Sequence, residues 1–216
     1  MKSVAIVAMG HSRAAYISEA STRPSEWTEV WTLNGLAGVL KADRLFLMDD
    51  LEIQQARSVR NPYVRVLLDA AKKATVPVYT ARKVEGYPNL VEYPLESVAG
   101  VLGLPALYAT NSVPYMVAMA IAEGFERIGI YGCDYTYGDG RTEKGRACLE
   151  WWCGFASAKG VHIQVPSTSS LLEGGKMPLY GYWTEDVQFS NGTVTRTRKE
   201  KIPTAEEVEK AMAHNG

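Results

Sequence analysis

The sequence predicts an α/β protein, a three-layer sandwich with a mostly parallel sheet, followed by a C-terminal β-hairpin and helix. Apolar runs of strand length alternate with helical segments up to about residue 166. The first of these runs, 3–10, is continuously apolar and ends in glycine, which is typical of a strand buried on both faces of a parallel sheet. The last fifty residues instead hold two alternating runs joined at Asn191-Gly192, a strong hairpin signal. The main part is therefore expected to be Rossmann-like.

The strands are recognised as apolar runs that end at glycine or at polar residues. They are expected at 3–10, 28–34, 43–50, 76–82, 127–133 and 161–166. The helices follow from apolar spacing and from their end signals, such as Gly103, Gly160 and a capping box formed by Thr204 and Glu207. They are expected at 11–20, 51–59, 62–74, 93–104, 114–123, 142–160 and 204–213, with a short turn or helix at 35–42.

The length of 216 residues suits one α/β domain with a small appendage. We place the division between residues 1–172, the nucleotide-binding domain, and 173–216, the hairpin and helix. A formal net charge of −1 does not indicate a polyanionic partner. The three cysteines show no zinc-ligand spacing, so reduced thiols in a cytoplasmic protein are expected. The first apolar run is too short for a signal peptide or a membrane span.

Ligands of open α/β sheets bind beyond the carboxyl ends of the strands, so the residues that follow each strand are the candidate site. After the first strand, Gly10, His11 and Ser12 open a helix whose free N–H groups favour phosphate, although a tight turn capped by Ser12 explains the same pattern. After the second strand, Asn34 offers an amide for a base edge or a ribose hydroxyl, or it forms a turn with Gly35.

Two carboxylates, Asp49 and Asp50, follow the third strand. They suit a Mg²⁺ ion or a general base, whereas the alternative is that Asp50 caps the next helix. Another candidate anion site precedes the helix at 114–123, where Asn111 and Ser112 offer hydrogen bonds and Pro114 fits the first turn.

After the strand at 127–133, Asp134 suits a sugar or ribose hydroxyl, and Tyr135 and Tyr137 suit a ring or a phosphate. Further candidates are the phosphate-neutralising cations Arg141 and Lys144, for which exposed surface is the alternative, and His162, a general base or a structural histidine.

The stretch "NSVPYMVAMAIAEGFERIGIYGCDY" resembles the segment "TSGVYMxAxAIxxGxxxIxLxGxDFY" of bacterial family 42 sialyltransferases. "VAIVAMGHSRA" resembles their "xIIAGNGPSL" nucleotide loop. The layout is also similar to motility-accessory-factor glycosyltransferases and to archaeal 6-hydroxymethylpterin diphosphokinases. "RACLEWWCGFASAKGVHIQVPSTSSLL", at 146–172, resembles a pattern found in phage proteins. The resemblance covers roughly residues 3–172.

The resemblance implies a bacteriophage-type transferase that uses a nucleotide-activated donor, with sugar transfer as the expected reaction. It maps donor binding onto the residues already named: Gly10, His11, Ser12, Asn34, Asn111, Ser112 and Asp134. It implies that Tyr135, with Arg141 or Lys144, stabilises the leaving phosphate. The base that deprotonates the acceptor is expected among Asp49, Asp50 and His162.

Two alternatives stay open at this point. One is a pyrophosphokinase-like enzyme that uses ATP, with Mg²⁺ at Asp49 and Asp50; the other is a nucleotide-binding protein without catalysis. A glycan or a modified DNA base is conceivable as the acceptor, and no membrane partner is expected. The sequence leaves the donor base, the metal dependence and the oligomeric state open.

Overall fold

The computed structural model describes residues 1–136, 140–172, 179, 181–190 and 192–213. The chain divides into two compact units, Met1–Gly174 and Gly175–Gly216. Among the described residues, no helix combines the length and the apolar character needed to cross a membrane.

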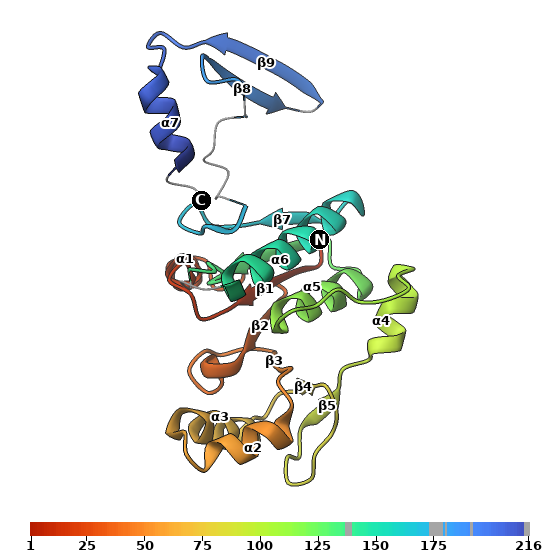
Figure 1. Cartoon of the computed structure of the whole chain (residues 1–216). Coiled ribbons are helices and arrows are strands. Elements are labelled where there is room, and N and C mark those ends of the chain that lie inside the picture. Colours follow the sequence, from red (N-terminus) through yellow and green to blue (C-terminus); the bar gives the residue numbers. More distant parts are fainter. Residues whose placement is uncertain (137–139, 173–178, 180, 191, 214–216) are drawn as a thin grey trace. The chain divides into compact units, whose positions relative to one another are not determined.

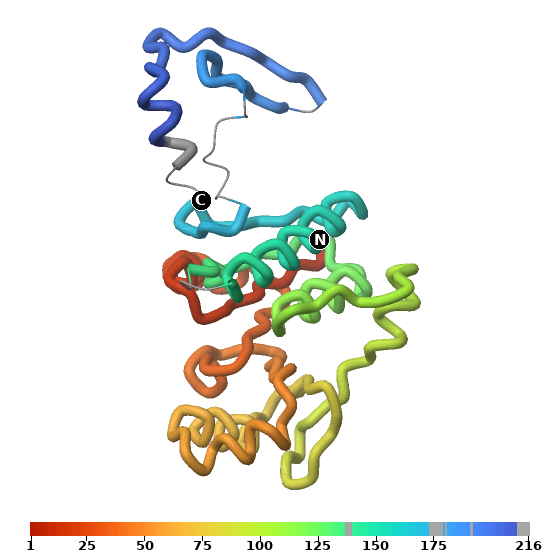
Figure 2. Tube along the Cα trace, in the orientation of Figure 1, coloured from red at the N-terminus to blue at the C-terminus, as the bar shows by residue number. Residues whose placement is uncertain are grey.

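The first unit contains a sheet of seven strands in the order β5-β4-β3-β2-β1-β6-β7, with every neighbouring pair parallel (Figure 1). The strands are β1 (Ser3–Val7), β2 (Glu29–Leu33), β3 (Arg44–Leu47), β4 (Val78–Thr80), β5 (Leu90–Glu92), β6 (Arg127–Tyr131) and β7 (His162–Gln164). The chain moves outward from β1 to β5 and then returns to the other side of β1 with β6 (Figure 2). The strand order therefore reverses between β1 and β6, which is where such sheets bind ligands.

Helices cover both faces of the sheet and make the expected three layers. One face packs against α1 (Arg13–Thr22), α2 (Leu51–Ser58) and α3 (Pro62–Lys73), and the other against α4 (Leu95–Leu102), α5 (Ser112–Ala122) and α6 (Gly140–Ala158). Helix α5 lies against the middle of the sheet, and its small residues Ala118 and Ala120 are fully buried there. Burial on both sides explains why the central strand β1 is apolar from Val4 to Val7.

The predicted alternation of strands and helices is confirmed. Each of the six predicted sheet strands is present, although each is shorter than its apolar run. Strand β5 was not predicted from the sequence. Gly103 ends α4 with φ 69°, as expected of a left-handed helix terminus. The segment after β2, predicted as a short turn or helix, is the 3₁₀ turn η1 (Asn34–Leu36).

The second unit holds an antiparallel hairpin and a helix. Strands β8 (Glu185–Ser190) and β9 (Thr193–Arg198) pair across the predicted turn, and α7 (Ala205–Ala213) follows. Asn191 of that turn lies outside the described residues. The capping box is confirmed: Thr204 N–H donates to Glu207 Oε2 at 2.8 Å, and Glu207 N–H donates to Thr204 Oγ1 at 3.2 Å.

Candidate active site at the carboxyl edge

The loops after β1 and β6 touch through their backbones. The N–H of Ala8 donates to the carbonyl of Tyr131 at 2.7 Å, and the N–H of Gly10 donates to that of Gly132 at 2.8 Å. A Cβ at Gly10 would lie 2.6 Å from the Gly132 oxygen and would overlap the Asp134 carboxylate. This close approach requires glycine at position 10.

Asp134 is the polar centre of this contact, and its residue is 2% exposed. Its Oδ2 accepts the N–H of Ser12 at 2.8 Å and lies 3.2 Å from Nδ1 of His11. The hydroxyl of Ser12 in turn accepts the N–H of Gly132 at 2.8 Å. The other carboxylate oxygen, Oδ1, is buried and has no hydrogen-bond partner among the described residues. A buried acceptor without a donor is a feature that a bound ligand can satisfy.

This arrangement corrects two expectations about the first loop. Ser12 does not cap α1 with its side chain, because its hydroxyl is used by Gly132. The loop also lacks the row of free amides expected for a phosphate, because the N–H groups of Gly10, Ser12 and Arg13 are all bonded internally. The backbone N–H of His11 is the exception, because it has no acceptor within the described residues. The ring of His11 is also exposed.

A second group of polar side chains lies at the start of α5. Asn111 caps the helix by accepting the N–H of Val113 at 3.1 Å, and its Nδ2 donates to the hydroxyl of Tyr135 at 3.2 Å. Gly145 of α6 makes room for this contact, since a Cβ there would lie 2.5 Å from the Tyr135 ring. Tyr135 has φ 47°, a strained value for a tyrosine and one that clusters at functional sites. Ser112 is buried beside it.

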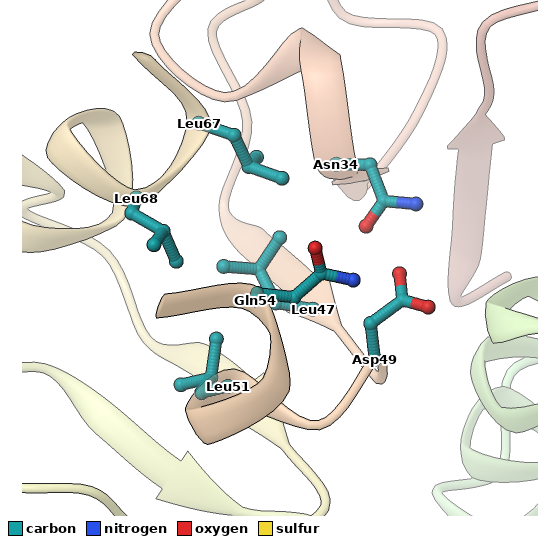
Figure 3. Close-up of a pocket in the computed structure, with 7 residues that line it drawn as sticks. All are labelled: Asn34, Leu47, Asp49, Leu51, Gln54, Leu67 and Leu68. Carbon is teal, nitrogen blue, oxygen red and sulfur yellow. The ribbon is translucent and has the colours of Figure 1, made fainter. Parts of the chain in front are cut away.

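A small pocket lies beyond the ends of β2 and β3 (Figure 3). The polar ends of Asn34, Gln54 and Asp49 lie near one another beside a group of leucine side chains. The leucines that line the pocket are Leu47, Leu51, Leu67 and Leu68. Oδ1 of Asn34 is buried and lacks a partner among the described residues, and the backbone of Asn34 has φ 45°. The pocket thus combines an apolar lining with a buried acceptor, Oδ1 of Asn34, that has no donor among the described residues.

The two adjacent carboxylates have different surroundings. Asp50 caps α2, because its Oδ1 accepts the N–H groups of Glu52 and Ile53 at 3.0 and 3.2 Å. Its Oδ2 pairs with Arg82 at 2.9 Å. Asp49 is exposed and lines the pocket. Since Asp50 is engaged, the pair does not form the shared cation site that adjacent carboxylates suggested. In the described part of the chain, no three potential metal-ligating side chains gather.

The remaining predicted residues separate into two places. Arg141 and Lys144 lie in the first turns of α6, whose Lys144 carbonyl is near Thr110 at 3.4 Å. Both side chains are exposed, and Gly145 of the same helix contacts the Tyr135 ring. His162 begins β7 and pairs in register with Arg127, the first residue of β6. It lies at the amino edge, so the structure does not bring it to the other candidates. Tyr137 lies outside the described residues.

Sequence reasoning missed the segment that follows β7. The carbonyl of Thr168 lies 3.0 Å from Nε2 of His11, and the hydroxyl of Ser170 donates to the backbone carbonyl of Asp134. A polar run directly after a core strand was the available signal. Tyr63 of α3 was also missed; its hydroxyl contacts the sulfur of Met9 at 3.4 Å.

The cysteine beside the site is not reactive. Burial raises the pKa of the Cys133 thiol far above its ordinary value, and the neighbouring Asp134 carboxylate raises it further. A thiol that stays protonated is a poor nucleophile. The chemistry of this edge therefore rests on oxygen and imidazole groups.

No family model and no curated protein match this chain. Among solved structures, it is similar to the sialyltransferase CstII from Campylobacter jejuni in complex with a substrate analogue, CMP-3FNeuAc, at 16% identity and a TM-score of 0.49, covering 98% of this chain and 99% of that one. A complex of CstII with cytidine-5'-monophosphate gives 17% identity and a TM-score of 0.48, with the same coverage. At these identities the likeness concerns the fold.

Proposed function

We propose that this protein is a nucleotide-dependent glycosyltransferase of sialyltransferase type, with its donor bound at the carboxyl edge of the sheet. The observation that carries the proposal is a pair of buried acceptors, Asn34 Oδ1 and Asp134 Oδ1, that lack donors among the described residues. Both lie beyond strand ends near the point where the strand order reverses. Donors with many hydroxyl and amino groups, such as a nucleoside joined to a sugar, suit such acceptors.

The other candidates fit roles around this donor. Gly10 lets the two loops approach, and His11 and Ser112 supply donors for phosphate oxygens. We assign the stabilisation of the leaving phosphate to Tyr135 and to the α6 cations Arg141 and Lys144.

Asp49 is the best placed of the predicted bases. It is exposed at the pocket, whereas Asp50 is engaged with α2 and Arg82, and His162 lies at the opposite edge. Asp49 would take the proton of the acceptor hydroxyl. Of Asp49 and Asp50, only Asp49 remains available to bind a magnesium ion. The magnesium-dependent alternative is therefore less well supported. The sequence motifs support a sugar donor.

The test is a thermal-shift screen against CMP, UDP, GDP, ADP, ATP and their sugar conjugates, with Mg²⁺ and with EDTA. A ligand at 100 times its Kd adds about 2.7 kcal/mol to the stability of the native state. Asn34→Gly and Ser112→Ala should each reduce the shift. The matched control is Ser18→Ala, which removes an exposed hydroxyl from α1 and should leave the shift intact.

Three outcomes separate the readings. Binding of one nucleotide that weakens in both site variants supports the proposal. Binding of ATP that needs Mg²⁺ would favour a pyrophosphokinase-like enzyme, and binding without turnover would favour a nucleotide-binding protein. Absence of binding by every nucleotide at millimolar concentration would refute a nucleotide site.

A further inference from the structure

His11 joins three segments that are far apart in the sequence. Its Nδ1 lies 3.2 Å from Oδ2 of Asp134, beyond β6, and its Nε2 lies 3.0 Å from the carbonyl of Thr168, beyond β7. The side chain of His11 is 61% exposed, whereas that of Asp134 is 1% exposed. Solvent can therefore reach the His11 ring, whereas the Asp134 carboxylate that contacts the ring is buried.

Both atoms that face the ring are acceptors. A neutral imidazole has one N–H and satisfies one of them, whereas a ring with a proton on each nitrogen satisfies both. The second form also places a positive charge next to a buried carboxylate that otherwise receives one backbone N–H. The two acceptors therefore suit a ring with a proton on each nitrogen, and in that form the Nε2 proton can be transferred.

We propose that His11 is the catalytic proton donor to the leaving phosphate and that Asp134 is its positioning residue. This inference rests on the proposed glycosyl transfer and adds a role that neither residue had in it. A phosphate oxygen of the donor would replace the Thr168 carbonyl as the acceptor of Nε2–H. The backbone N–H of His11 has no acceptor among the described residues and would be a second donor to the same phosphate.

The proton and electron balance is complete within the named groups. The bond between the anomeric carbon and the phosphate oxygen breaks, its electrons move to that oxygen, and the oxygen takes the Nε2 proton. The acceptor hydroxyl forms the new bond to carbon and passes its proton to Asp49. The ring ends neutral, with Nδ1–H still donated to Asp134. Proton transfer suits this leaving group because the second ionisation of a phosphate monoester lies near pH 6.

Among the described residues, few charged groups lie near the His11 ring. From the end of β6 there is Asp134, and from its own loop Arg13, whose guanidinium donates to the carbonyls of Met9 and Gly10. The segment after β7 presents the Thr168 carbonyl and, among its described residues, no ionisable side chain from 166 to 172.

The first experiment tests the pairing without any activity. The chain has three histidines, so histidine-selective ¹⁵N labelling gives a spectrum in which His162→Gln and His11→Gln assign two rings. A hydrogen-bonded proton on Nδ1 of His11 is expected near neutral pH, and Asp134→Asn should remove it. A bare Nδ1 in the unsubstituted protein would overturn the inference.

The second experiment measures CMP release from CMP-N-acetylneuraminic acid by the full chain. His11→Gln keeps an N–H donor but cannot release a proton, so kcat should fall about 100-fold while the Kd for CMP changes less than about threefold. Asp134→Asn should lower kcat in the same direction. If kcat of the unsubstituted protein falls at high pH because the ring loses its proton, that fall should be absent in His11→Gln.

Other results count against specific parts. A raised KM with unchanged kcat in His11→Gln would make His11 a binding residue and overturn the inference alone. A large loss of kcat in His162→Gln instead would move the proton transfer to the other histidine and also overturn it. If the unsubstituted protein turns over no nucleotide-sugar while the ring pairing is present, the proposed function is what fails.

Discussion

The contact between the β1 and β6 loops predicts that Gly10→Ala damages both stability and binding. The added methyl group would lie 2.6 Å from the Gly132 carbonyl oxygen and 3.0 Å from Cγ of Asp134. The first neighbour is backbone and the second is a buried side chain, so neither moves without loss. The substitution should force the two loops apart.

The magnitude follows from two contributions. Overpacking a filled site costs about 1–3 kcal/mol. Displacing Asp134 weakens a hydrogen bond from Ser12 to a charged acceptor, and such bonds contribute about 1.5–3 kcal/mol. We therefore expect a loss of about 3 kcal/mol in the free energy of unfolding of the first unit, with partial relaxation included.

Urea unfolding followed by tryptophan fluorescence is the assay, because four of the five tryptophans, Trp27, Trp31, Trp151 and Trp152, lie in the first unit. The matched control is Gly154→Ala in α6, where a Cβ meets nothing within 4 Å. Since alanine favours helix more than glycine, this control should gain about 0.5–1 kcal/mol. If Gly10→Ala is as stable as the unsubstituted protein and binds nucleotide equally well, the loop contact is wrongly described.

Three further predictions concern groups away from the site. Arg44→Ala should lower the free energy of unfolding by about 2–4 kcal/mol, because the Arg44 side chain is 16% exposed and pairs with two carboxylates. The control is Arg23→Ala, whose side chain is 59% exposed; it should change the free energy of unfolding by less than about 0.5 kcal/mol in the same urea assay. Burial raises the pKa of Cys153 to about 12 from 9.0, so the native state holds this proton more tightly than the unfolded state. The contribution to stability should be complete below pH 9 and should fall as the pH rises towards 12. Alkaline unfolding curves should show a smaller fall for Cys153→Ala. Thr204→Ala should destabilise α7 by about 1 kcal/mol, seen as faster amide exchange in that helix with unchanged exchange in α3.

Features that depend on neighbouring residues could be predicted from the sequence. The cap of α2 by Asp50, the left-handed end of α4 at Gly103 and the capping box at Thr204 each involve residues within a few positions of one another. The alternation of buried strands and helices is also local, and it was enough to give the α/β layers. Local signals thus predicted the fold and the edge at which the candidate residues gather.

The arrangement of the candidate site depends on contacts that no local signal encodes. Ser12 and Asp134 are 122 positions apart, and His11 and Thr168 are 157 apart. Each of these residues has an ordinary local interpretation, and only the pairing of β1 with β6 makes them neighbours. His162 is different, because its position at the start of a predicted parallel strand already indicated the amino edge.

The two edges of the sheet use their polar side chains in opposite ways. At the amino edge, Arg44 pairs with Glu29 and Glu123 at 2.9 and 2.6 Å, and these charges satisfy one another. At the carboxyl edge, Oδ1 of Asn34 and Oδ1 of Asp134 are buried and have no donor among the described residues. Removing an unsatisfied acceptor costs little stability, and glycine also accepts φ 45° without strain. Asn34→Gly should therefore change the free energy of unfolding by no more than about 1 kcal/mol while it weakens nucleotide binding. A larger loss of stability would mean that this oxygen has a structural partner, and the case for a ligand there would fail.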